Sequence, residues 1–317
     1  MSDILVRLRK KIKRGSMKII VFGGSGFLGS HVADALTEAG HDVTIYDIKK
    51  SCYVNKHQKQ IVGDILDEAK VKRAIKGCDV VYNFAGLADI EEAQARPIET
   101  IRNNVLGNTF LLEAARINKI KRFVFASSVY VYSEAGGFYR SSKQACELII
   151  ENYRKIYGLN YTILRFGSLY GPRADEKNWI YTILKQAMRE NKITRYGDGE
   201  ELREYVHVYD AASCSVEILK KEYENQNIII TGHLQMKIKD LLVMIKEMMG
   251  NKIKIEYKST PNGVHYNVTP YSFYPKMAKK LVSHCYMDMG QGILDLLSEI
   301  SLKQTKNEIK KIVLKKK

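Results

Sequence analysis

The stretch that most constrains this chain is a short apolar run followed at once by closely spaced glycines. Residues 18–22 read Lys-Ile-Ile-Val-Phe, and Gly23, Gly24, Gly26 and Gly29 follow within seven positions. Such a run predicts a buried parallel strand, and the glycines predict a tight turn into a helix that begins near residue 27. The turn lets the backbone approach a pyrophosphate, which the helix N-terminus attracts. The residues expected to line this dinucleotide site are Gly23, Ser25, Gly26, Phe27, Leu28 and Gly29.

A carboxylate at the end of the second predicted strand indicates which dinucleotide binds. That strand spans residues 41–46 and is followed by Asp47, 18 residues after Gly29. A carboxylate at this spacing is expected to hold a ribose 2′-hydroxyl and to repel a 2′-phosphate, although Lys49 and Lys50 weaken the repulsion. The pattern favours NAD. The alternative is an ordinary strand–turn–helix connection without a ligand.

Strands and helices continue to alternate along the chain. Further strands are predicted at 60–62, 80–84, 122–126 and 161–166, and helices at 67–75, 97–117 and 141–157. This alternation predicts an α/β fold, a Rossmann-like doubly wound parallel sheet with helices on both faces. After residue 172 the elements become shorter and mixed, which indicates a smaller mixed α/β substrate lobe. The predicted divisions are a basic tail (1–16), an NAD-binding domain (17–167), a substrate lobe (168–301, with some segments returning to the first domain) and a Lys-rich tail (302–317).

The positive charge is concentrated at the two ends of the sequence. The net charge is +16, and the tails 1–16 and 302–317 carry +5 and +6 of it. This distribution disfavours a nucleic-acid-binding surface on the body of the protein. Residues 4–12 interleave apolar and basic side chains, so contact with a membrane surface or a partner protein through the tails is a hypothesis.

Cysteine and histidine usage bears on compartment and metal content. The five cysteines are dispersed, without a C-x-x-C pair, and the histidines show no metal-binding spacing. We therefore expect reduced thiols, no metal and a cytoplasmic location. No apolar run approaches the ~20 residues of a membrane span, and no secretory segment is expected at the start.

A second motif supplies candidate catalytic groups. Tyr139 and Lys143 are four residues apart, so they share one face of a helix, and Ser128 ends the preceding strand. A free phenol has a pKa of about 10, so a tyrosine base must be acidified by about 3 units to act near neutral pH. A lysine ammonium one turn away and the positive ring of an oxidised nicotinamide both favour the phenolate. Ser128 is expected to hydrogen-bond the same substrate oxygen. The alternative is a surface pair on a helix.

Together these motifs resemble the extended short-chain dehydrogenases/reductases of the nucleotide-sugar epimerase/dehydratase family. The resemblance runs in family order from about residue 17 to 300. It is carried by Tyr139-x-x-x-Lys143 and by residues 23–29 (GGSGFLG), 63–64 (GD), 83–87 (NFAGL), 103–107 (NNVLG), 127–132 (SSVYVY), 164–173 (LRFGSLYGPR) and 197–208 (GDGEELREYVHV).

The resemblance implies roles for further residues. Those implied to contact NAD are Asp64 and Ile65 at the adenine, Ala85, Gly86, Leu87 and Asn103 near the pyrophosphate and nicotinamide ribose, and Gly167 beside the nicotinamide. Arg203 matches the arginine that holds the nucleotide diphosphate, and Ser168 stands where many members have asparagine near the sugar phosphate. Ser128, Tyr139 and Lys143 match the catalytic trio. The helices beginning near residues 98 and 141 resemble the pair that forms a dimeric four-helix interface.

Two departures from the family pattern bear on the reaction. Family 4,6-dehydratases carry an Asp-Glu pair directly after the residue matching Ser128, and this chain has Val129 and Tyr130 there. Neither side chain can move protons at C5 and C6 of a sugar, so dehydration is disfavoured. The gap of eleven residues from Ser128 to Tyr139 is also short for a sugar epimerase, which suggests a more open sugar pocket.

The expected reaction is NAD-dependent oxidation and reduction at C4 of a nucleotide-linked sugar. We expect a 4-epimerase that acts through a transient 4-keto sugar. The alternatives are a 4-dehydrogenase or 4-keto-sugar reductase with the same trio, and, outside this class, a non-catalytic dinucleotide-binding protein. The expected partners are a nucleotide-sugar substrate and a second copy of the chain.

Overall fold

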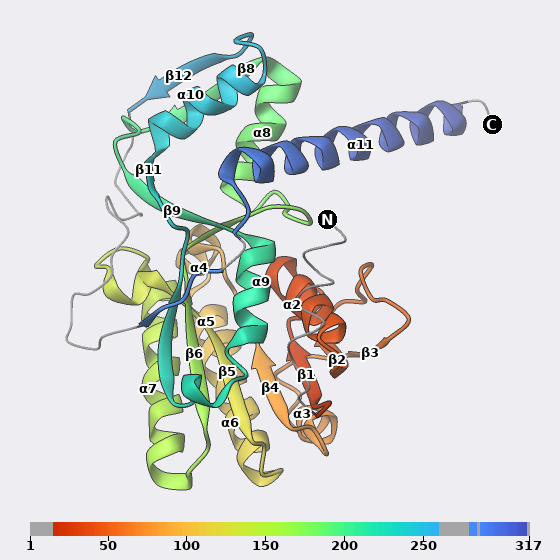
Figure 1. Cartoon of the computed structure of the whole chain (residues 1–317), viewed down its shortest axis with the longest axis vertical. Coiled ribbons are helices and arrows are strands. Elements are labelled where there is room, and N and C mark those ends of the chain that lie inside the picture. Colours follow the sequence, from red (N-terminus) through yellow and green to blue (C-terminus); the bar gives the residue numbers. More distant parts are fainter. Residues whose placement is uncertain (1–14, 260–278, 284–285, 316–317) are drawn as a thin grey trace.

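The computed structural model describes residues 15–259, 279–283 and 286–315. It has two parts, a large sheet with helices on both faces and a smaller lobe from which the last helix extends (Figure 1). Residues 4–12, which interleave apolar and basic side chains, lie outside the described residues.

The large sheet is parallel throughout, which confirms the predicted α/β fold. Its eight strands, in spatial order, are β13 (Lys279–Lys280), β10 (Gln226–Ile230), β6 (Tyr161–Phe166), β5 (Arg122–Ser128), β4 (Val80–Asn83), β1 (Lys18–Phe22), β2 (Asp42–Asp47) and β3 (Gln58–Val62). The order reverses at β1 and β4, so helices from the two directions cover opposite faces. The carboxyl ends of the strands beside this reversal are where ligands bind in such sheets.

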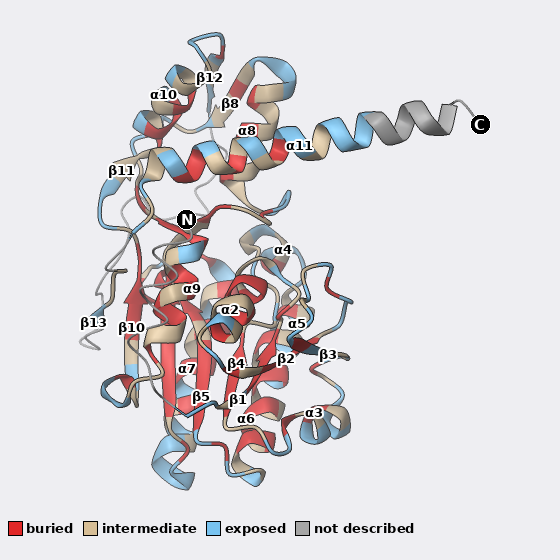
Figure 2. Ribbon diagram, turned by 45° about the vertical axis from the view of Figure 1, so that its right-hand side comes forward, coloured by how far each residue is buried: buried red, intermediate tan, exposed pale blue. Residues whose placement is uncertain are grey.

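Alternating side chains of the central strands pack into two separate cores. Ile19 and Val21 of β1 pack with α2 (Phe27–Glu38) and α9 (Val208–Glu217). Ile20 and Phe22 face the opposite core, which the remaining large-sheet helices complete. These helices are α3 (Glu68–Ile75), α6 (Gly107–Ile117) and α7 (Gly137–Tyr157). Burial on both faces explains why β1 is an uninterrupted apolar run, and the sheet is the most continuously buried part of the molecule (Figure 2).

The smaller lobe has its own core, in which α8, α10 and α11 pack together. Its elements are β7 (Ser168–Tyr170), α8 (Trp179–Glu190), β8 (Lys192–Tyr196), β9 (Leu202–His207), β11 (Gln235–Lys237), α10 (Ile238–Met248), β12 (Lys254–Lys258) and α11 (Met289–Lys315). β9 pairs with β7 in parallel and with β11 antiparallel, while β12 pairs with β8. Between β9 and β11 the chain returns to the large sheet through α9, the short turn η3 (Lys221–Tyr223) and β10.

Several element boundaries differ from the sequence prediction. Helix α7 begins at Gly137 rather than near residue 141, because Gly136 and Gly137, at φ of 96° and 47°, turn the chain into the helix early. The single helix predicted over 97–117 is instead α5 (Pro97–Thr100), a π-helical turn η1 (Ile101–Leu106) and α6, preceded by the short α4 (Ile90–Ala95). Strand β5 continues past the predicted residues 122–126 to Ser128, the residue expected at its end, and passes directly into a 3₁₀ turn, η2 (Val129–Tyr132).

No helix among the described residues combines the length and the apolar composition that crossing a membrane requires.

Candidate active site

The glycine turn after β1 leaves an open, uncapped helix N-terminus. Gly23 has φ of 74° and lies against the backbone of residues 84 and 85, where an added Cβ would come within 2.6 Å. Gly29 packs the first turn of α2 on the strand end, since a Cβ there would lie 2.2 Å from the carbonyl oxygen of Gly23. The N-cap residue, Gly26, offers no side chain to the first turn of α2. The backbone N–H groups there are therefore suited to an anion such as a pyrophosphate.

Asp47 lies at the end of the neighbouring strand β2, beside this turn. Its two carboxylate oxygens accept backbone N–H bonds from Ser25 and Lys49, each at 3.0 Å. The Ser25 hydroxyl donates to the Lys49 carbonyl oxygen at 3.0 Å, which ties the glycine turn to the end of β2. The carboxylate is thus held next to the glycine turn, where the ribose of a bound dinucleotide is expected. The chain's own residues fit NAD at this position.

The residues predicted at the adenine lie beyond β3. Asp64 is exposed, its carboxylate accepts from the Leu66 N–H at 2.9 Å, and its carbonyl oxygen accepts from the Tyr46 hydroxyl at 2.9 Å. Ile65 is buried against Gly107, where a Cβ would lie 2.5 Å from its Cδ1 atom. Both residues therefore lie in the turn that follows β3.

An asparagine that the sequence analysis did not select fixes the loop after β4. The Asn104 side chain accepts from the Leu87 N–H at 2.7 Å and donates to the Leu87 carbonyl oxygen at 3.0 Å. Gly86, at φ of 139°, has no room for a Cβ, which would lie 2.5 Å from Asn104 Oδ1. Asn103, the predicted residue, donates instead to the Glu99 carbonyl oxygen of its own helix at 2.9 Å. The π-helical turn shifts the phase of the helix, so the Asn-Asn pair alone could not show which member faces the loop.

The three predicted catalytic residues lie where β5 meets the first turns of α7. Lys143 Nζ donates to the Ala126 carbonyl oxygen at 2.8 Å and lies 5.7 Å from the centroid of the Tyr139 ring. Ser128 follows Ala126 by two residues, so the two side chains share one face of the strand. Ser128 Oγ accepts from the Tyr130 N–H at 3.3 Å, which leaves the hydroxyl proton to donate elsewhere.

Burial sets the electrostatics of this group. Tyr139 and Lys143 are 9% and 6% exposed. Burial lowers the pKa of Lys143, while the neighbouring Cys146 and Glu147 raise it. A positive charge in this low-dielectric position interacts strongly with a phenolate one helical turn away.

A buried ion pair lies beside the end of β5 and is hydrogen-bonded to it. Glu147, one turn beyond Lys143, receives bonds from Arg165 at 2.6 and 3.0 Å and from the Ser127 hydroxyl at 2.5 Å. Arg165 also donates to the Tyr132 hydroxyl. The side chains of Arg165 and Glu147 are 2% and 6% exposed. The sequence analysis did not identify this network, although an arginine inside an otherwise apolar strand was a signal for it.

The residues predicted at the nicotinamide and the substrate follow β6 and lie on β9. Gly167 is closely surrounded, since a Cβ there would lie 2.8 Å from Thr231 Cγ2 and 3.0 Å from the Glu204 carbonyl oxygen. Ser168 begins β7 and pairs in register with Tyr205 of β9. Arg203, also on β9, is 6% exposed and donates to the Leu202 carbonyl oxygen at 3.0 Å. The small three-stranded sheet thus holds Ser168 and Arg203 on paired strands. Among the described residues, no cluster of three or more histidine, cysteine, aspartate or glutamate side chains could hold a metal ion.

Comparison with known proteins bears on the same motifs. Residues 19–231 match the family described as NAD dependent epimerase/dehydratase. A UDP-glucose 4-epimerase of Lactobacillus helveticus is 30% identical over 238 residues, which are 64% of this chain and 72% of that protein. A UDP-N-acetyl-α-D-glucosaminuronate decarboxylase of Bacillus cytotoxicus is 27% identical over 75% of this chain and 82% of that protein.

A solved structure extends the likeness to most of the chain. The UDP-glucose 4-epimerase of Thermotoga maritima, determined with UDP-glucose, superimposes with a TM-score of 0.79 at 25% identity. The match covers 91% of this chain and all of that one. The glycine turn, the parallel sheet and the match over residues 19–231 agree, and this chain belongs to the NAD-dependent epimerase/dehydratase family, as an enzyme that uses NAD on nucleotide sugars.

Proposed function

We propose that this chain is a nucleotide-sugar 4-epimerase. The observation that carries the proposal is the position of Lys143, buried between the Ala126 carbonyl and the Tyr139 ring at the end of β5. In this role Tyr139 takes the proton of the C4 hydroxyl, and bound NAD supplies the hydride acceptor. Lys143 stabilises the phenolate by its charge, and the Ser128 hydroxyl donates to the developing C4 oxygen.

The second half of the reaction requires the same groups. The 4-keto sugar rotates within the site and receives hydride on its other face, while Tyr139 returns the proton to the C4 oxygen. Arg203 holds the nucleotide diphosphate through both halves, a role suited to a guanidinium, which binds phosphate oxygens in pairs. Ser168 contacts the sugar or its adjoining phosphate.

The residues after Ser128 separate epimerisation from elimination of water. Val129 is buried and Tyr130 packs its ring edge-to-face on Tyr139, with the centroids 6.2 Å apart. No acid therefore stands at either position to move protons at C5 and C6, and a 4,6-dehydratase is disfavoured. A 4-dehydrogenase or 4-keto-sugar reductase uses the same trio and is the second candidate. A purely dinucleotide-binding role would leave the buried Tyr139–Lys143 pair without a purpose.

Mass-resolved chromatography of a nucleotide-sugar panel tests the proposal. Purified protein is incubated with UDP-, GDP-, dTDP- and CDP-sugars, and a new isomer of unchanged mass is expected. Loss of two hydrogens would indicate a dehydrogenase, and loss of water would contradict the assignment of Val129 and Tyr130. An unchanged product profile in the Tyr139→Phe variant would contradict the mechanism.

We also propose that the enzyme is a homodimer through α5, η1, α6 and α7. This face exposes large apolar side chains, which a second copy would bury. They are Ile98, Ile101, Leu106, Ile117, Leu148 and Ile156. Ile98 and Leu148 are 76% and 54% exposed, and their helices lie in contact. Light scattering is expected to give twice the chain mass, and Ile98→Glu with Leu148→Glu is expected to give the single chain mass.

A further inference from the structure

The last helix, α11, has two halves with different surroundings. In the first half Ile293, Leu296 and Ile300 are buried in the core of the smaller lobe. From residue 301 onward this packing ends: Leu302 is 63% exposed, and residues 305–308 are all exposed. Figures 1 and 2 show the helix continuing well beyond the body of the molecule. In the second half, between Leu302 and Glu308, the helix therefore adds no buried side chain to this core.

The sequence of this half is strongly basic and also apolar. Residues 302–317 contain seven lysines against one glutamate, without an arginine or an aromatic residue. Five apolar residues are interleaved with the lysines: Leu302, Ile309, Ile312, Val313 and Leu314. Residues 1–16 repeat the combination of basic and apolar side chains, with a net charge of +5.

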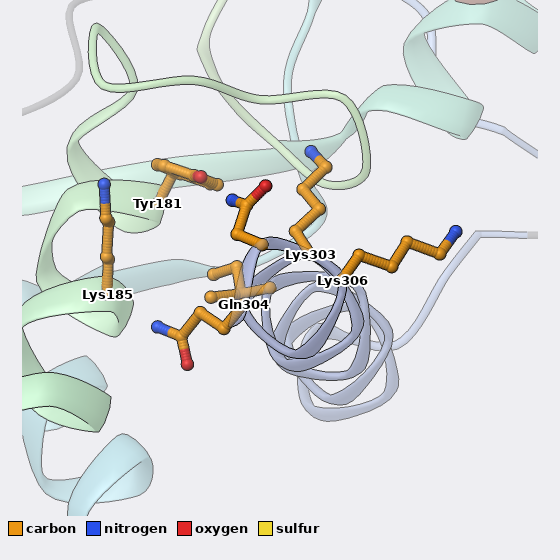
Figure 3. Close-up of a pocket in the computed structure, with 7 residues that line it drawn as sticks. Tyr181, Lys185, Lys303, Gln304 and Lys306 are labelled. Atoms are coloured by element: carbon orange, nitrogen blue, oxygen red, sulfur yellow. The ribbon is translucent and has the colours of Figure 1, made fainter. Parts of the chain in front are cut away.

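A groove at the base of the projecting half belongs to the same basic surface. It encloses about 540 Å³ between α8 and α11 and is lined by Tyr181, Lys185, Ile300, Lys303, Gln304, Lys306 and Asn307, with no carboxylate (Figure 3). Lys185 pairs with Glu176, and Lys303 pairs with Glu299 at 2.6 Å. Lys306 has no ion pair within the described part of the chain and points away from α8 (Figure 3). Lys306 thus presents a positive charge at the start of the projecting half.

Two solved structures are matched over their full length by part of this chain. The Thermotoga epimerase is matched in full by 91% of this chain, and an N-acetylglucosamine epimerase of Methanobrevibacter ruminantium in full by 92%. About a tenth of this chain lies outside each match.

We propose that the projecting half of α11 docks the enzyme on an anionic lipid surface. Basic side chains are drawn to such a surface, and apolar side chains between them insert at the boundary of the headgroups. Nucleic acid would engage the lysines but not the apolar residues. A second copy of this helix would be repelled, because both carry the same net charge of +6 over residues 302–317. The inference is independent of which nucleotide sugar the enzyme converts.

Vesicle sedimentation of the full chain tests the proposal. The protein is expected to sediment with phosphatidylcholine vesicles that contain ~30% phosphatidylglycerol, and to stay in solution with pure phosphatidylcholine. The binding should weaken strongly between about 0.05 and 0.5 M salt, because the Debye length shortens. Equal binding to both vesicle types would overturn the proposal.

Charge-reversed variants locate the binding surface. Changing Lys306, Lys310 and Lys311 to Glu is expected to weaken binding to the anionic vesicles by at least about 100-fold. The matched control changes Lys72, Lys76 and Lys252, exposed lysines on other surfaces, to Glu and alters the net charge equally. The control is expected to bind almost as well as the native protein.

Two outcomes would overturn the assignment. Equal loss in both triple variants would show that only overall charge matters. Binding to a duplex DNA oligonucleotide that depends on the three tail lysines, without binding to vesicles, would assign the helix to nucleic acid instead. Bound NAD, read from the absorbance of released cofactor, should be the same in all variants.

Discussion

The large sheet and the smaller lobe differ in how their candidate residues are positioned. Around β4 and β5, the Asn104 side chain accepts from the Leu87 N–H at 2.7 Å, and Lys143 donates to the Ala126 carbonyl oxygen at 2.8 Å. In the smaller lobe, Arg203 is buried on β9, and its guanidinium donates to the carbonyl oxygen of its neighbour Leu202 at 3.0 Å. The catalytic candidates thus lie at the carboxyl end of a parallel sheet that is buried on both faces, whereas Ser168 and Arg203 lie on short paired strands of the smaller lobe.

The largest expected effect on activity comes from removing the Tyr139 hydroxyl. Tyr139→Phe should lower kcat by about 10²–10⁴-fold, because no other group in the trio can take the C4 proton. Turnover and the absorbance of released cofactor would be measured together, and the bound NAD should be unchanged. Tyr157→Phe, at the exposed end of the same helix, is the matched control and should retain full activity.

Breaking the buried Glu147–Arg165 ion pair should lower the free energy of unfolding more than breaking an exposed pair. Glu147→Gln leaves Arg165 buried without its charge partner, and we expect unfolding to become easier by about 3–5 kcal/mol. Denaturant unfolding followed by circular dichroism measures this. Asp42→Asn removes a pair with Lys59, which is 70% exposed, and should cost less than about 1 kcal/mol. Similar effects of the two changes on unfolding would contradict the claim that the Glu147–Arg165 pair stabilises the end of β5.

The folding stability should fall in acid because of two buried histidines, His31 on α2 and His207 on β9. Burial lowers the pKa values of His31 and His207 to about 4, from an ordinary value of 6.5. The unfolded chain therefore binds protons that the folded one does not, and stability falls as the pH drops from 6.5 toward 4, by up to about 3 kcal/mol for each histidine. Burial raises the pKa of Asp210 to about 6, and its protonation acts in the opposite direction.

Variants separate these contributions. His207→Gln should flatten the fall in melting temperature between pH 6.5 and 4, whatever it does to stability at pH 8. His57→Gln, at an exposed position, should leave the profile unchanged. If the melting temperature of His207→Gln fell with pH as steeply as that of the native protein, protonation of the His207 imidazole would not be the cause of the acid sensitivity.

The smallest of these effects concerns the substrate lobe. Arg203→Lys should raise KM for the nucleotide sugar by about 10-fold with kcat nearly unchanged, because an ammonium cannot bind two phosphate oxygens in one plane. Steady-state kinetics on the converted sugar measures the separation. A fall in kcat at constant KM would instead place Arg203 in the chemical step.

The sequence predicted the large sheet more fully than the lobe for physical reasons. Parallel strands buried on both faces appear as apolar runs, and the glycine turn and Tyr139–Lys143 spacing are local patterns. Asn104 could not be chosen over Asn103, because the π-helical turn that orients it is not encoded by a local periodicity. Glu147 and Arg165 meet only through the pairing of distant elements. In the lobe, short strands such as β7 and β11 leave no comparable periodic signal.

The central claim is that hydride leaves C4 of the sugar and returns to the same carbon without leaving the site. The most direct test uses the nucleotide sugar that the enzyme converts, synthesised with deuterium at C4. The position of the label in the product is then found by nuclear magnetic resonance. We predict an epimer that retains the deuterium at C4. Deuterium released to water, or carried away on free reduced cofactor, would contradict the epimerase account.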